Sequence, residues 1–166
     1  MGKVQNVFGY GYAGEVTRSI DDIIIAVRNA SDSDIAFGAP VFMTDYGAVP
    51  FDISNPQDFT TFLGFAVRVA DKTPETYPTG QFNDSQSGVW KAGSVMEVLV
   101  RGSIALATNQ SGVKGGKLYI RKSDGKLTTS AGASGTTVLL ENVHIRNPRN
   151  DWSSCCEAVV NERNIL

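Results

Sequence analysis

The clearest indication of the fold is the stretch Leu118-Tyr119-Ile120-Arg121-Lys122-Ser123-Asp124-Gly125-Lys126-Leu127-Thr128. Two β-prone arms flank the Asp-Gly pair. Asp-Gly favours a two-residue type I′ turn, because both central residues of that turn need a positive φ. The stretch therefore predicts a β-hairpin with Asp124 and Gly125 at its tip.

Short β-prone segments recur on both sides of this hairpin. Val95 to Arg101 is apolar on both faces apart from Glu97, which indicates a central strand covered on each side. Ile23 to Val27 is a β-branched run that ends in a polar turn cluster. So many short strands between turn residues predict an all-β fold, a single small β-barrel or β-sandwich domain. With the hairpin arms and the central strand included, the strands expected after Val27 are 40–43, 62–69, 94–101, 103–107, 117–122, 126–129, 136–140 and 157–160.

Length and composition agree with one turn-rich β-domain. The chain has 166 residues, 17 of them glycine, and only 19% are charged, against roughly 25% in average soluble domains. Phe8-Gly9-Tyr10-Gly11-Tyr12-Ala13-Gly14 interleaves aromatic residues with glycines and shows neither a helical nor a strand period. We therefore divide the chain into an extended N-terminal arm, residues 1–20, and a β-rich body, residues 21–166. Within the body, residues 71–89 are expected to form a long surface excursion.

Charge and hydropathy lower the expectation for several classes of partner. A formal charge of -2 gives no global field toward nucleic acid, and no apolar run approaches the ~18 residues of a membrane span. The N-terminus lacks the apolar stretch of a signal peptide, so synthesis and retention in a cytoplasm are expected. Cys155 and Cys156 are adjacent, which disfavours a disulfide between them.

Motifs that suggest chemistry are incomplete. Gly9 to Gly14 has the dinucleotide-binding spacing G-x-G-x-x-G, but no full strand precedes it and a β-branched run, not an amphipathic helix, follows. Gly112 to Leu118 lacks the first glycine and the hydroxyl residue of a phosphate loop. His144 is the only histidine, and the aspartates at 21–22 and 32–34 lack the other ligands of a calcium loop. We expect no catalytic residues, no cofactor and no metal.

The arm also carries a resemblance to a known family. Phe8 to Arg18 resembles the N-terminal arm of bacteriophage structural cement (capsid decoration) proteins, in which a Gly-Tyr-Ala-Gly-acidic stretch ending in Arg precedes the first body strand. The tail from Thr136 adds nothing to the likeness. Further similar pieces follow in the family's order at 35–41, 62–68, 77–80, 95–101, 102–104 and 115–119.

The resemblance implies a structural virion protein and not an enzyme. Such a protein is made in the host cytoplasm, binds the major capsid protein on the outer face of the assembled head shell, often as a trimer, and stabilises the shell. Large interfaces gain affinity from aromatic and arginine anchors. The capsid-contact candidates in the arm are therefore Phe8, Tyr10, Tyr12 and Arg18.

Two other readings stay open. A sugar- or receptor-binding β-module of a phage tail or fibre would share the β-architecture and present a shallow aromatic platform, which Trp90 and Trp152 are available to form. A metal-dependent hydrolase is the weaker alternative, and metal analysis of the pure protein tests it.

Overall fold

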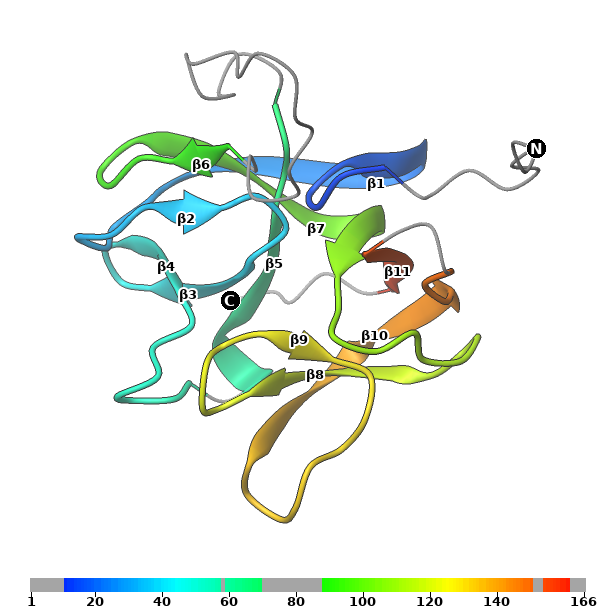
Figure 1. Ribbon diagram of the computed structural model, residues 1–166. Coiled ribbons are helices and arrows are strands. Elements are labelled where there is room, and N and C mark those ends of the chain that lie inside the picture. Colours follow the sequence, from blue (N-terminus) through cyan, green and yellow to red (C-terminus); the bar gives the residue numbers. More distant parts are fainter. Residues whose placement is uncertain (1–10, 58, 70–87, 151–153, 162–166) are drawn as a thin grey trace, which may run out of the picture.

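The computed structural model describes residues 11–57, 59–69, 88–150 and 154–161 (Figure 1). Their regular structure is β apart from one 3-10 turn, η1 (Phe59–Thr61). The predicted all-β class is confirmed. The strands are β1 (Val16–Arg28), β2 (Ile35–Ala36), β3 (Pro40–Thr44), β4 (Gly47–Pro50), β5 (Phe62–Ala66), β6 (Val89–Trp90), β7 (Val95–Ala107), β8 (Lys117–Arg121), β9 (Leu127–Thr128), β10 (Thr137–Asn147) and β11 (Cys155–Val160).

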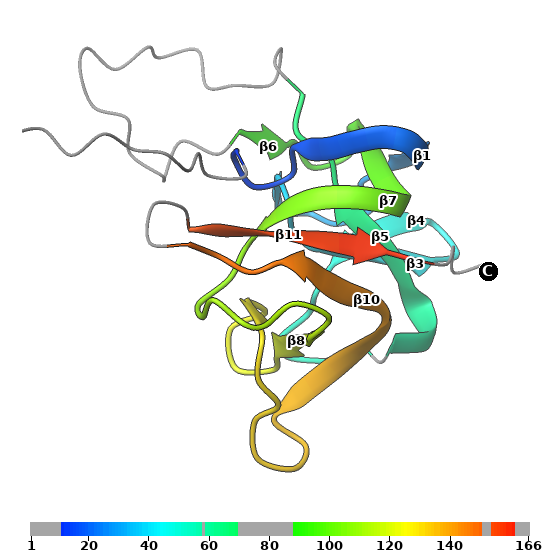
Figure 2. The same cartoon turned by 90° about the vertical axis from the view of Figure 1, so that its right-hand side faces the viewer.

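Most strands belong to one antiparallel sheet. Its order is β4-β3-β5-β7-β11-β10-β8-β9, and β1 pairs with β7 beside this path, while β2 and β6 form a separate two-stranded sheet. The large sheet curls on itself into an open half-barrel, as the two views show (Figures 1 and 2). The arrangement brings β1 and β11, which lie far apart in the sequence, to opposite edges of β7.

β7 is the central strand that the apolar run predicted. It pairs with β1 on one edge, and on the other edge with β5 near Leu99 and then with β11 from Gly102 onward. The sequence suggested two strands here, whereas β7 continues through Gly102, whose φ of 124° bends it without ending it. A Cβ on Gly102 would overlap the Asp22 carboxylate of β1, so this position requires glycine. The bend coincides with the irregular register of β1 between Arg18 and Ile23.

Two apolar clusters cover the two faces of the sheet. The larger cluster is built around Phe42, Phe62, Leu99 and Ile104 and includes buried side chains of β8, β10 and β11. The smaller one is built from Phe37, Val41, Met96, Val98 and other side chains on the opposite face, with Trp90 of β6 among them. Strand alternation explains the division, because neighbours such as Val98 and Leu99 point to opposite faces.

The predicted hairpin is present, but its turn differs from the prediction. β8 pairs with β9, and the Arg121 backbone N–H donates to the Lys126 carbonyl across 2.9 Å, which closes a loop of residues 122–125. Gly125 has a φ of 67°, and the described part of the chain has no positive φ outside glycine. The two-residue type I′ turn is therefore wrong. The Asp124 carboxylate accepts hydrogen bonds from Arg121 and from the Lys126 backbone, and these contacts stabilise the longer turn.

Other strand boundaries also differ from the expectation. β1 begins at Val16 and not near Ile23, so residues 16–20, which the sequence placed in the arm, run along β7. β10 extends to Asn147, and the short strands β2, β4 and β6 were not expected. The division into an arm and a body stays a prediction for residues 1–10, which lie outside the described residues, as does most of the excursion 71–89.

The loop between β9 and β10 is the most protruding described connection. Its residues 130–136 are all exposed. In both views it lies at the end of the molecule opposite β1 and β6 (Figures 1 and 2).

Candidate functional site

The start of the described chain is fastened to the body before β1 begins. We call residues 11–15 the root segment. The Gly14 N–H donates to the Ala105 carbonyl across 2.8 Å, and the Arg68 N–H donates to the Gly14 carbonyl across 2.7 Å. Gly14 has a φ of 83°, and a Cβ there would lie 2.7 Å from the backbone nitrogen of Gly38. The contact between the root segment and the body therefore depends on glycine at position 14.

An aromatic and arginine cluster lies beside the root segment. The Arg68 guanidinium carbon is 4.7 Å from the ring centre of Tyr12 and 5.7 Å from that of Phe37. Phe37 is buried and meets Trp90 edge-on at 6.1 Å between ring centres, whereas Tyr12 is 49% exposed. Stacking on a guanidinium orients an exposed ring. We call Tyr12, Phe37, Arg68 and Trp90 the root cluster, and it presents one pre-oriented tyrosine to solvent.

Arg18, another of the predicted contact residues, is held by a partner within the chain. Its Nε donates to Glu157 Oε1 across 3.0 Å, and Thr17 Oγ1 donates to the same oxygen across 2.8 Å, while Asn147 donates to Oε2. Burial raises the pKa of Glu157, but the three hydrogen bonds outweigh it and the pKa lies below its usual value. Arg18 keeps 57% of its side chain exposed, so one face stays open to a partner. Its role as a capsid contact stays a prediction.

Sequence reasoning did not identify Glu157 as a buried charge. The side chains that satisfy it come from β1 and β10, and Thr17 lies 140 positions away in the chain. A glutamate in a short apolar strand carries no local signal for such partners. Only the strand order, which sets β1 and β11 on either side of β7, brings them together.

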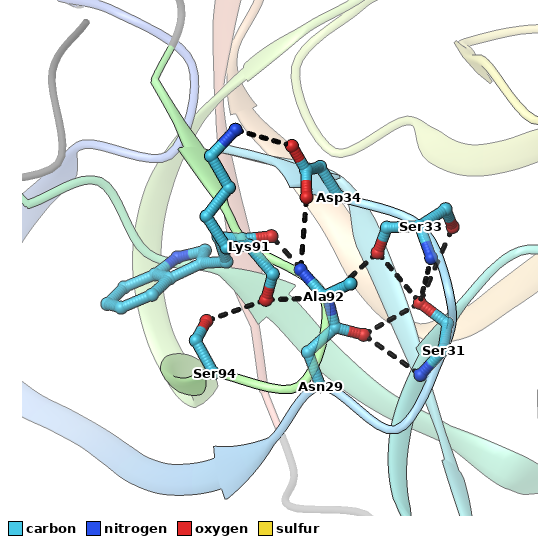
Figure 3. A network of polar contacts seen from close by, with 8 residues as sticks. Asn29, Ser31, Ser33, Asp34, Lys91, Ala92 and Ser94 are labelled. Atoms are coloured by element: carbon cyan, nitrogen blue, oxygen red, sulfur yellow. Dashed lines mark hydrogen bonds and ion pairs between the residues drawn. The ribbon is translucent and has the colours of Figure 1, made fainter. Parts of the chain in front are cut away.

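A polar network ties the β1–β2 turn to the turn after β6 (Figure 3). Asn29 is fully buried, and its Nδ2 donates to the carbonyls of Ser33 at 2.9 Å and Lys91 at 3.2 Å, while its Oδ1 accepts from Ser31. The Lys91 Nζ lies 2.8 Å from Asp34 Oδ2, and the Lys91 hydrogen bond is the main cause that lowers the pKa of Asp34. The Asp34 carboxylate is thus paired with Lys91, which argues against a calcium site at residues 32–34.

The base of the excursion is fixed by the same neighbourhood. The Trp90 Nε1 donates to the Val67 carbonyl across 2.9 Å, so the chain that leaves the body after β5 and the chain that returns at β6 are joined. Trp90 is only 4% exposed and offers no aromatic platform for a sugar. Trp152, Phe8 and Tyr10 lie outside the described residues.

The remaining motifs have structural explanations where the chain is described. Gly14 is followed by β1, so no helix follows the dinucleotide-like glycines, and Gly112 to Gly116 form the turn before β8. Cys155 and Cys156 are buried thiols, and burial raises the pKa of Cys156 to about 11. Within the described residues no group of three or more His, Cys, Asp or Glu is placed to hold a metal, and no helix is long and apolar enough to cross a membrane.

Comparison with known proteins identifies the family. A solved chain from "The capsid of Myoviridae Phage XM1" shares this fold with a TM-score of 0.67, at 18% identity over 96% of both chains. The head fiber gp8.5 N base of bacteriophage phi29 aligns with 87% of this chain and 99% of its own at 9% identity, with a TM-score of 0.41 that is too low to indicate a shared fold. No curated protein sequence matches significantly. The pattern of the family described as structural cement protein (E217 gp24/Pam3 gp6) matches residues 2–151, and the chain therefore belongs to the structural cement protein family of bacteriophages.

Proposed function

We propose that this protein is a capsid cement protein that binds the outer surface of the assembled phage head and stabilises the shell. The observation that carries the proposal is the family match over residues 2–151. A structural role in the virion follows from that membership. We further propose that the protein binds the outer face of the shell, that the major capsid protein is its direct partner, and that it has no catalytic activity.

The root cluster supports a contact surface at this end of the molecule. Tyr12 is exposed and stacks on the Arg68 guanidinium, which also lies over the buried Phe37 ring, so the tyrosine ring needs little further ordering when a partner covers it. Burying an aromatic ring yields roughly 1.5 to 3 kcal/mol. Phe8 and Tyr10 precede this anchor directly in the sequence, and we propose that they bind the same partner.

An arm of this kind binds only if its contacts exceed the cost of ordering it. Fixing one backbone residue costs roughly 1 to 2 kcal/mol, so each buried ring offsets the ordering of about one or two residues. The hydrogen bonds of Gly14 already order the root segment before binding. The preformed root therefore lowers the number of shell contacts that the arm requires. A trimer would bring several arms to the shell at once and so supply repeated contacts, and the trimeric state that the family resemblance implies is part of the proposal.

Reconstitution on empty shells tests the function. Purified protein is added to expanded shells that lack it, and occupancy and the thermal stability of the shells are measured. We expect saturable binding at a fixed ratio to the major shell protein and a higher shell melting temperature. Mass measurement on the free protein tests the trimer. No binding, or binding without any change in shell stability, would contradict the cement function.

A further inference from the structure

A groove lies between residues of β1, β7, β10 and β11. It has a volume of about 340 Å³, and it lies where the irregular part of β1 separates from β7 near Gly102. Ile20, 95% exposed, stands at its edge. The polar side chains on the β7 and β10 side of the groove are Arg101, Ser103 and Arg146, and Asn161 follows β11.

Two arginines of the groove have no acidic partner in the described part of the chain. The ion pairs between described residues are Arg18–Glu157, Lys91–Asp34 and Arg121–Asp124, so Arg101 and Arg146 are in none of them. Both residues are exposed. Arg146 Nη1 donates one hydrogen bond to Ser103 Oγ across 3.2 Å, which orients its guanidinium over β7. The remaining guanidinium donors are available to an acceptor from outside the chain.

Two acids, Asp21 and Asp22, also line the groove, and neither forms an ion pair with Arg101 or Arg146. Asp22 lies against Gly102, and its Oδ1 is buried without a hydrogen-bond partner among the described residues. Burial is the main cause that raises the pKa of Asp22, the nearby Ser103 backbone opposes this shift, and the charge of Asp21 adds to it. The Glu157 carboxylate is occupied by its three donors. Asp21 is the one exposed acid that lines the groove.

The pairing of strands extends the basic character across the sheet. Ser103 is paired with Val159, Val159 with His144, and His144 with Lys117, which places these residues in one row. Burial is the main cause that lowers the pKa of His144, and the charges of Arg146 and Lys117 lower it further. Arg146 and Lys117 thus place two positive charges near His144, although the whole chain carries a net charge of -2.

We propose that this groove binds an acidic segment of the shell polypeptide, whose carboxylates accept charge-assisted hydrogen bonds from Arg101 and Arg146. The proposal rests on the cement function and adds a second contact to that of the root cluster. Arginine forks match carboxylates bidentately. An acidic segment supplies the carboxylate partners that Arg101 and Arg146 lack among the described residues, and the exposed Ile20 gives it an apolar rim.

Charge reversal at the groove tests the proposal on assembled shells. The variants are R101E/R146E, the milder R101Q/R146Q, and the matched control K126E, which reverses an exposed lysine in the β8–β9 turn. Occupancy is titrated at low and high salt, and the melting temperature of each free protein is measured. We expect R101E/R146E to weaken shell binding by roughly tenfold or more at low salt, with R101Q/R146Q intermediate and K126E unchanged. The wild-type affinity should fall with salt more steeply than that of R101E/R146E.

The outcomes separate this inference from the cement function. If the wild type and R101E/R146E bind shells equally well, the proposed groove contact is wrong and the cement function stands. Wild-type protein that does not bind shells overturns both. If R101E/R146E keeps its shell affinity but loses self-association in sedimentation, the groove receives a second copy and the proposal is wrong. If R101E/R146E has a lower melting temperature than the wild type, its weaker binding could reflect a loss of folding. The shell affinity of R101Q/R146Q then decides, because this variant introduces no negative charge beside Asp21.

Discussion

Replacing Gly14 with alanine measures how firmly the root segment is held. A residue with a side chain at a φ of 83° costs roughly 1 to 2 kcal/mol. Its Cβ would also lie 2.7 Å from the Gly38 nitrogen and 2.9 Å from the Ala66 carbonyl oxygen, and neither backbone atom can rotate away. The chain must therefore bear the overlap or release the root segment from β5 and β7.

Release of residues 11–14, with Glu15 still bonded to the Ala105 N–H, sets the upper limit of the loss. It removes the hydrogen bonds from Gly14 to Ala105 and from Arg68 to Gly14, worth about 1 kcal/mol each. It also removes the stacking of Arg68 on Tyr12, worth about 0.5 to 1 kcal/mol at an exposed site. We therefore expect the free energy of unfolding of Gly14→Ala to fall by about 3 kcal/mol.

Urea unfolding followed by circular dichroism gives this loss, and Gly93→Ala is the matched control. Gly93 has a φ of 74° but nothing within 4 Å of a Cβ, so it reports backbone strain without overlap. We expect about 1 kcal/mol for Gly93→Ala, hence a difference of about 2 kcal/mol between the variants. Equal losses would show that the root segment is not packed against Gly38 as described.

Three further predictions concern the arm, the buried glutamate and the hairpin. Deleting residues 1–10 should leave the melting temperature of the free protein unchanged and weaken shell binding by roughly tenfold or more. Deleting residues 1–20 should also destabilise the fold, because it removes Arg18 from Glu157. Full shell occupancy without residues 1–10 would exclude the arm as the anchor. Because the pKa of Glu157 is lowered in the folded state, its contribution to stability is present above the unfolded value of about 4.3 and is lost as the pH falls through the lowered folded value. The difference in unfolding free energy between wild type and Glu157→Gln should thus be constant near neutral pH and shrink below about pH 4.3, and a constant difference down to pH 3 would count against the network. Gly125→Val should cost about 1 kcal/mol or more because of its φ of 67°, and an unchanged melting midpoint would refute that turn conformation.

The elements that the sequence predicted well are those in which local pattern and tertiary environment agree. Val95 to Arg101 is apolar on both faces because β7 has strands on both edges and an apolar cluster on each face. The hairpin at 118–128 was found because both of its arms are β-prone, yet its turn was misjudged. The Asp124 side chain bonds back to Arg121 and Lys126, and these contacts select a longer turn with a single left-handed glycine.

The elements that were missed depend on contacts between distant residues. Residues 16–20 resemble a loop because the aspartates that follow interrupt the apolar pattern, but the irregular register of β1 lets Asp22 lie against Gly102 of β7. β4 contains Gly47 and Pro50, which disfavour a strand, and it forms at the edge of the sheet beside β3. For the candidate site, Tyr12 was recognised by composition, whereas Arg68 and Glu157 become visible only in three dimensions.

The exposed β9–β10 loop has a practical consequence. Residues 130–136 lie at the end of the body opposite β1 and β6 (Figures 1 and 2). A protein that attaches through its root cluster would hold this loop away from the shell, toward the surrounding medium. Exposed loop tips with small residues accept insertions most readily. A foreign epitope carried there would be displayed on every attached copy, which makes the loop a natural position for arraying antigens on the particle.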